Sequence, residues 1–138
     1  RAMIDEPEIE EVEINPVLLR EMVKNLVDNA IKYTPHGGRV TVRTRFAGSP
    51  ILEVEDTGPG IPETDRERVF ERFYRVLGSG ADGSGLGLPI VREIAELHRA
   101  IVTLDANPAG QGTLARVVFP RSHLHAPPPV QGDVYPLG

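Results

Sequence analysis

Three groups of polar and glycine residues in this chain have the types and spacings that chemistry needs. Asn25 and Asn29 stand four residues apart, Asp56 ends an apolar run, and glycines punctuate residues 83–88. Carboxamide oxygens can hold a hard metal ion, and a carboxylate can accept a hydrogen bond from a base. Backbone amides at a helix start attract phosphate. None of the groups is decisive alone, but in combination they indicate a nucleotide site.

Asn25, Asn29 and Lys32 share one edge of a predicted helix over residues 17–33. At about 100° per residue, the apolar side chains fill one broad arc, and these three polar residues form a narrow stripe beside it. A half-buried asparagine must be hydrogen-bonded, so each of the two could cap nearby loop backbone. Two carboxamides beside an ammonium group instead favour a site for Mg²⁺ and phosphate.

Asp56 ends a strand that the alternation pattern predicts over residues 51–56. The period of two puts its carboxylate on the same face as the apolar core side chains of the strand. A buried anion needs donors, and the exocyclic amine of a purine would be one. Capping of the turn that follows explains the residue equally well. Gly58 and Gly60 lack a β-carbon, so a flat ring could approach their backbone.

The glycine-rich run at residues 83–88 leads into a helix predicted over residues 88–98. Unpaired amides and the positive end of the helix dipole at such a start favour a phosphate chain. No Gly-Lys-Ser/Thr follows, so the run is not a P-loop, and its spacing and late position do not suit a dinucleotide-binding βαβ unit.

The remaining pattern predicts an α/β protein in which helices and strands alternate. Helices are expected over residues 17–33, 64–73 and 88–98, and strands over residues 8–14, 39–46, 51–56, 101–105 and 113–119. The tail over residues 121–138 has three consecutive prolines and little to bury, so it is expected to be disordered. We therefore expect a two-layer sandwich, with three helices on one face of a mixed sheet of about five strands.

Composition excludes several classes of protein. The 138 residues, 40% of them hydrophobic, suit one domain with a single core. A net charge of −5 offers no general attraction to nucleic acid or to an anionic membrane surface. The chain has no cysteine, and so no disulfide or thiolate metal site, and no apolar run of about 18 residues that would span a bilayer. Because it starts with Arg1, we expect a piece of a longer protein.

Five segments together resemble the catalytic and ATP-binding domain of bacterial sensor histidine kinases. This domain belongs to the GHKL superfamily, which includes Hsp90, type II topoisomerases and MutL. Residues 25–35 are similar to the N box, 56–62 to the G1 box, 70–75 to the F box, 83–88 to the G2 box and 110–113 to a final glycine box. The motifs occur in the order of the family. The resemblance implies the Bergerat-type ATP-binding fold, with residues 1–120 as the catalytic domain.

The resemblance also implies a role for each matching residue. Asn29 would be the main Mg²⁺ ligand, with Asn25 supporting the metal or the phosphates and Lys32 reaching a phosphate. Arg75, and less surely Arg72, would approach the γ-phosphate. In this picture Asn25, Lys32 and Arg75 are the catalytic residues, and ATP with Mg²⁺ is the ligand.

The base and the triphosphate would be held by a second set. Asp56 would accept from the adenine amine, and Tyr33 would pack near the ring. Residues 76–84 would form the ATP lid. The other expected nucleotide contacts come from the glycine boxes and their neighbours: Gly58, Gly60, Ile61, Gly83, Gly85, Leu86, Gly87, Leu88 and Thr113.

The chain departs from the family pattern after His98, where Arg99 and Ala100 replace a customary glycine pair. A non-glycine residue with positive φ costs roughly 1 kcal/mol, so either the turn differs or strain is accepted. No histidine here has the setting of a phosphoacceptor. The resemblance therefore implies partners: a dimerisation domain of the same parent protein that carries the acceptor, and a response-regulator receiver domain. It further implies a monomeric cytoplasmic domain of an inner-membrane sensor, without membrane contact of its own.

Other functions remain open for such motifs. One is an ATPase of the Hsp90 or topoisomerase kind, disfavoured because Asn25 stands where water-attacking relatives carry a glutamate. A second is a serine kinase of the anti-sigma-factor type. A third is a nucleotide sensor without catalysis.

Overall fold

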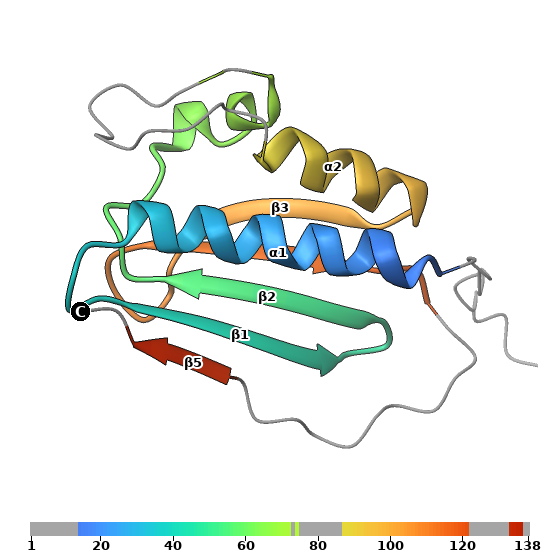
Figure 1. The fold of residues 1–138 in the computed structure, drawn as a ribbon, viewed down its shortest axis with the longest axis horizontal. Coiled ribbons are helices and arrows are strands. Elements are labelled where there is room, and N and C mark those ends of the chain that lie inside the picture. The colour runs from blue at the N-terminus through green and yellow to red at the C-terminus, as the bar shows by residue number, and fades with distance from the viewer. Residues whose placement is uncertain (1–13, 73, 75–86, 122–132, 137–138) are drawn as a thin grey trace, which may run out of the picture.

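The computed structural model describes residues 14–72, 74, 87–121 and 133–136. Two helices lie over one face of a five-stranded sheet (Figure 1). The elements in chain order are α1 (Pro16–Tyr33), β1 (Arg39–Phe46), β2 (Pro50–Asp56), the 3-10 helices η1 (Glu63–Asp65) and η2 (Arg68–Phe70), α2 (Gly87–Leu97), β3 (Ile101–Ala106), β4 (Thr113–Val118) and β5 (Asp133–Pro136). This confirms the predicted two-layer α/β architecture.

The sheet has the strand order β3-β4-β2-β1-β5, and each of its four described pairings is antiparallel. The prediction of a mixed sheet was therefore wrong in this detail. Short connections close β1 with β2 and β3 with β4 into antiparallel pairs, and the two pairs join through antiparallel β2 and β4.

Two predicted elements take a different form. The helix expected over residues 64–73 is replaced by η1 and η2, and the helical backbone ends at Glu71, where ψ is 143°. Asp133–Pro136, expected to be disordered, instead form β5, which pairs with the outer edge of β1 and satisfies backbone groups there. The strand expected over residues 8–14 lies almost wholly outside the described residues.

The register of the strands separates two faces of the sheet. Val54 pairs with Val42 on one side and Ala115 on the other, and all three pack into the core beneath the helices. Glu53 pairs with Arg43 and Arg116 on the opposite face. Asp56 lies two residues beyond Val54, so its side chain emerges on the helix-covered face.

α1 begins and ends at residues that satisfy its free backbone groups. The Asn15 side chain accepts from the N–H groups of Val17 and Leu18, both at 3.1 Å, and Pro16 occupies the first helical position. The Thr34 hydroxyl donates to Ala30 O at 2.7 Å. Met22, Leu26 and Ala30 are buried, so the apolar arc predicted from periodicity is the face that meets the sheet.

α2 ends in a Schellman motif built on a non-glycine residue. Arg99 has φ of 54°, Ala100 N–H donates to Ala95 O at 2.8 Å, and Arg99 N–H donates to Glu96 O at 3.0 Å. Of the two alternatives that the sequence left open, the turn is therefore kept and the strain is accepted.

His98 joins the end of α2 to the start of α1. Asn15 N–H donates to its Nε2 at 3.0 Å, so this nitrogen carries no proton, and Nδ1–H donates to Ile94 O at 3.0 Å. The ring is 2% exposed. The contact therefore fastens the helix layer at this end with both ring nitrogens in use.

Candidate functional site

A cavity of about 690 Å³ opens between α1, the ends of β2 and β4, and the first residues of α2. Its walls include the polar edge of α1, residues 59–62 after β2, residues 110–112 before β4, and Thr113 at the start of β4. Apolar side chains such as Leu26, Val54 and Leu88 form its floor. The volume and the mixture of apolar floor with a few polar groups are typical of a small-molecule site.

The predicted polar stripe of α1 does face the cavity: Asn25, Asn29, Lys32 and also Tyr33 line it. The Asn25 Nδ2 donates to Glu21 O at 2.8 Å, one turn earlier in the helix. A carbonyl accepts only from the amide nitrogen, so this bond leaves the Asn25 Oδ1 on the other side of the group. Oδ1 then lies toward Gly87, where a β-carbon would be 3.8 Å from it.

The donor set suits a hard cation held by amide oxygens and not one held by acidic clusters. In the described part of the chain, no group of three or more His, Cys, Asp or Glu residues could hold a metal ion. Asn25 and Asn29 instead line the cavity with neutral carboxamide groups, which fits Mg²⁺ arriving with phosphate ligands of its own.

Asp56 is held by structural hydrogen bonds and also lines the cavity. Its Oδ1 accepts from Gly58 N–H at 2.9 Å and from Thr113 N–H at 3.1 Å, and the side chain lines the cavity although the residue is only 8% exposed. The two interpretations left open by the sequence are thus compatible. One carboxylate oxygen caps the turn, and Oδ2 is left to face a ligand.

Burial raises the pKa of the Asp56 carboxyl, and the nearby Glu55 charge acts in the same direction. The hydrogen bonds from the backbone of Gly58 and Thr113 oppose this shift without cancelling it. No cationic group contributes to the pKa of Asp56 in the described structure. Any hydrogen-bond donor that a ligand supplies therefore stabilises this desolvated carboxylate.

Two glycines are required where the backbone closes around Asp56. A β-carbon on Gly58 would lie 2.7 Å from Tyr33 O, and one on Gly112 would lie 1.8 Å from Asp56 O. Gly112 also has φ of 128°. The G1 and final glycine boxes therefore allow α1, β2 and the loop before β4 to meet at the cavity.

The structure brings most of the predicted site residues together. Those that line the cavity are Asn25, Asn29, Lys32, Tyr33, Asp56, Gly60, Ile61, Gly87, Leu88 and Thr113. Gly58 bonds to Asp56 from behind the cavity wall. Arg75, Gly83, Gly85 and Leu86 lie outside the described residues. Arg72 is described and exposed.

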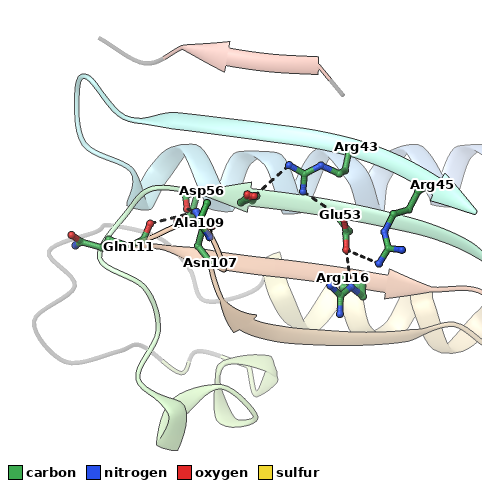
Figure 2. A network of polar contacts seen from close by, with 9 residues as sticks. Arg43, Arg45, Glu53, Asp56, Asn107, Ala109, Gln111 and Arg116 are labelled. Atoms are coloured by element: carbon green, nitrogen blue, oxygen red, sulfur yellow. Dashed lines mark hydrogen bonds and ion pairs between the residues drawn. The ribbon is translucent and has the colours of Figure 1, made fainter. Parts of the chain in front are cut away.

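Several residues at or beside the cavity were not predicted as site residues, among them Arg66, Tyr74 and Asn107. Arg66 lines the cavity and donates from Nε to Ile61 O at 3.1 Å. Tyr74 also lines it, while its hydroxyl donates to Asp65. Asn107, which no motif singled out, donates from Nδ2 to Asp56 O at 2.8 Å (Figure 2). The only signal for Asn107 was its place between a strand and a glycine turn, a common setting for a capping asparagine.

Comparison with known proteins agrees with this geometry. Residues 14–123 match the family of histidine kinase-, DNA gyrase B- and HSP90-like ATPases. The sensor protein kinase PmrB of Pseudomonas aeruginosa is 43% identical over 117 residues, which are 83% of this chain and 24% of PmrB. The kinase/phosphatase MprB of Mycobacterium tuberculosis is 44% identical over 115 residues, which are 79% of this chain and 23% of MprB. The chain thus spans about a quarter of the length of these relatives.

Solved structures show the same fold. A mycobacterial sensor histidine kinase MprB structure superposes with a TM-score of 0.72 at 39% identity, covering 82% of this chain and 76% of that one. A full-length ShkA structure in complex with AMPPNP has a TM-score of 0.67 at 33% identity, covering 80% of this chain and 23% of that one. No helix in the described ranges has the length and apolarity needed to cross a membrane. The chain belongs to the histidine kinase-, DNA gyrase B- and HSP90-like ATPase family, and within it to the catalytic and ATP-binding domains of sensor histidine kinases.

Proposed function

We propose that this chain binds ATP with Mg²⁺ and donates the γ-phosphoryl group to a histidine on the dimerisation domain of its parent protein. From there the phosphoryl group would pass to an aspartate of a response-regulator receiver domain. The observation that carries the proposal is the pairing, across one cavity, of the buried Asp56 carboxylate with the Asn25, Asn29 and Lys32 stripe of α1.

The two walls of the cavity would bind opposite ends of the nucleotide. Asp56 Oδ2 would accept from the adenine amine, because Oδ1 is already committed to Gly58 and Thr113. The apolar floor would pack against the ring. The amide oxygens of Asn29 and Asn25 would hold Mg²⁺, which supplies charge neutralisation on the phosphates when bound, and Lys32 would add a further positive charge.

The one buried histidine of the described residues is unsuited as a phosphoacceptor. His98 has both ring nitrogens hydrogen-bonded and is buried, so neither nitrogen can reach a phosphate. His36 is exposed in the turn after α1, and His123 and His125 lie outside the described residues. A kinase of this family that acts on its dimerisation domain needs only positioning and electrostatics from the present chain.

Incubation with γ-labelled ATP, Mg²⁺ and the separately produced dimerisation domain of the parent tests the proposal. Label on the histidine of that domain is the expected result. Asn29→Ala should abolish it while nucleotide-free thermal unfolding stays unchanged, and Lys24→Ala, on the exposed face of α1, is the matched control that should retain it. Phosphate release without an acceptor would instead indicate an ATPase. Label on a serine of an added protein would indicate the serine kinase. ATP binding with neither phosphate release nor label transfer would indicate a nucleotide sensor.

A further inference from the structure

Asn107 is a buried polar residue whose amide is fully engaged. It follows the last residue of β3 and is 6% exposed. Its Nδ2 donates to Asp56 O at 2.8 Å and more weakly to Gln111 O at 3.4 Å, and its Oδ1 accepts from Ala109 N–H at 2.9 Å. Figure 2 shows these bonds converging at the end of β2. One side chain therefore both folds the turn before β4 and ties it to the strand that carries Asp56.

The turn that Asn107 folds also supplies a bond to the Asp56 carboxylate. Asn107 N–H donates to Gly112 O at 3.0 Å, and the next residue, Thr113, donates its N–H to Asp56 Oδ1. Gly112 itself packs so closely on Asp56 O that a β-carbon there would be only 1.8 Å away. Main chain and side chain of Asp56 are thus both held by a segment whose shape Asn107 determines.

Asn107 is not among the residues that line the cavity, whereas Asp56 and Thr113 are. Any influence of Asn107 on a ligand is therefore indirect, through Asp56 and through residues 110–113 of the turn, which also line the cavity. Without the Nδ2 donor, Asp56 O would lose a buried partner, and the Thr113 amide would lose the support that keeps it on Oδ1. Oδ1 of Asp56 would then keep only the bond from Gly58 N–H, and its carboxylate would be less firmly oriented.

We propose that Asn107 is a positioning residue that fixes the direction of Asp56 Oδ2 and so sets the preference of the cavity for a purine with an exocyclic amine. The inference rests on the proposed function. It adds a determinant of base selectivity that lies outside the sequence motifs and out of contact with the ligand.

The test measures a ratio of affinities. Calorimetry gives the dissociation constants of ATP and of purine riboside triphosphate, which has the same sugar and phosphates but no amine. The unmodified chain should prefer ATP. Asn107→Ala and Asn107→Asp should each reduce this preference about tenfold, the loss expected for a hydrogen bond to a charged group that is no longer aligned.

The two variants separate the bond to Asp56 from the shape of the turn. Asn107→Asp has nearly the same size and keeps an oxygen for Ala109 N–H, but it can donate neither to Asp56 O nor, more weakly, to Gln111 O. Its added charge repels both triphosphates alike, and this part cancels in the ratio. Because the same charge raises the pKa of Asp56, the ratio is measured at a pH at which Asp56 is ionised. Glu53→Gln is the matched control: it weakens the same strand from the opposite face and should leave the ratio unchanged.

Three results would overturn the inference. The affinities for both nucleotides could fall by one common factor, or neither affinity could change, so that in each case the ratio stays as in the unmodified chain. Alternatively, both variants could fail to fold, which would make Asn107 a folding determinant. If Asn107→Ala alone does not fold, Asn107→Asp decides. The proposed function fails separately, when the unmodified chain binds neither nucleotide.

Discussion

Two buried carboxylates stand three residues apart on β2 and point to opposite faces of the sheet. Glu53, 4% exposed, meets the guanidinium groups of Arg116 at 2.7 Å, Arg45 at 3.3 Å and Arg43 at 3.5 Å. Asp56, 8% exposed, receives only backbone N–H groups on one of its oxygens in the described structure. Figure 2 shows the two environments side by side.

The difference separates a carboxylate that stabilises the fold from one that is available to a ligand. Burial raises the pKa of Glu53, but the bonds and charges of Arg116 and Arg45 outweigh it, and the pKa ends below its ordinary value. For Asp56 burial prevails and the pKa is raised. A carboxylate whose charge is compensated by arginines contributes little to ligand binding, whereas one without such compensation binds a hydrogen-bond donor of the ligand favourably.

The substitution Asp56→Asn is expected to have the largest effect, a loss of ATP affinity. The N–H groups of Gly58 and Thr113 converge on Oδ1, so the amide oxygen must take that place and Nδ2 must take the place of Oδ2. A donor would then face the adenine amine, and ATP affinity should fall about hundredfold. Inosine triphosphate, which carries an oxygen at that position, should lose less or gain. Unchanged discrimination between the two nucleotides by calorimetry would break the comparison.

Glu53→Gln should have the opposite profile. Removing the charge leaves three arginines clustered without their shared anion, and the free energy of unfolding should fall by about 2 kcal/mol, less than for a fully buried pair because the arginines are partly exposed. Urea unfolding measures this loss, and ATP affinity should stay the same. Weaker ATP binding together with unchanged stability would show that the open face takes part in recognition.

The two carboxylates should also respond to pH with opposite signs. The folded-state pKa of Glu53 lies below 4.5, so the stability it contributes is present above that value and is lost as the pH falls through the folded pKa. The folded-state pKa of Asp56 lies above 3.8, so its ionisation costs stability at higher pH, and this cost is relieved as the pH falls through the folded pKa. Urea unfolding of Glu53→Gln, Asp56→Asn and the unmodified chain should be measured as the pH is lowered through these pKa values. The difference in unfolding free energy from the unmodified chain should change in opposite directions for the two variants.

The smallest effect is expected far from both carboxylates, at the end of α2. Arg99→Gly should be about 1 kcal/mol more stable than Arg99→Ala, because only glycine is free of strain at φ of 54°. Comparing these two variants removes the arginine side chain from both. Thermal unfolding measures the difference, and nucleotide affinity should be equal in the two. Equal stability would mean that the turn relaxes.

Much of the fold and of the candidate site could be predicted, because the residues that line the cavity lie on elements with a clear local sequence pattern. Helical periodicity placed Asn25, Asn29 and Lys32 on one edge of α1, and the strand period placed Asp56 on the core face. Both placements are confirmed. At Arg99 the missing glycine left two outcomes open, a different turn or accepted strain, and the structure shows the strain.

The misses arise from contacts between residues distant in sequence. Asn107 and Asp56 are 51 positions apart, and no local pattern records a bond from a side chain to a remote carbonyl. β5 was missed because a short, proline-flanked segment has little strand signal of its own. It pairs because β1 offers it an edge.

The pairing of β5 with β1 has a practical consequence for anyone who shortens this chain. The span that matches the family ends at residue 123, ten positions before β5 begins. A fragment cut there would uncover the N–H and C=O groups of β1 at the margin of the sheet, and such a margin is a template for a second copy. Keeping Asp133–Pro136 therefore keeps residues 39–42 of β1 paired within the chain.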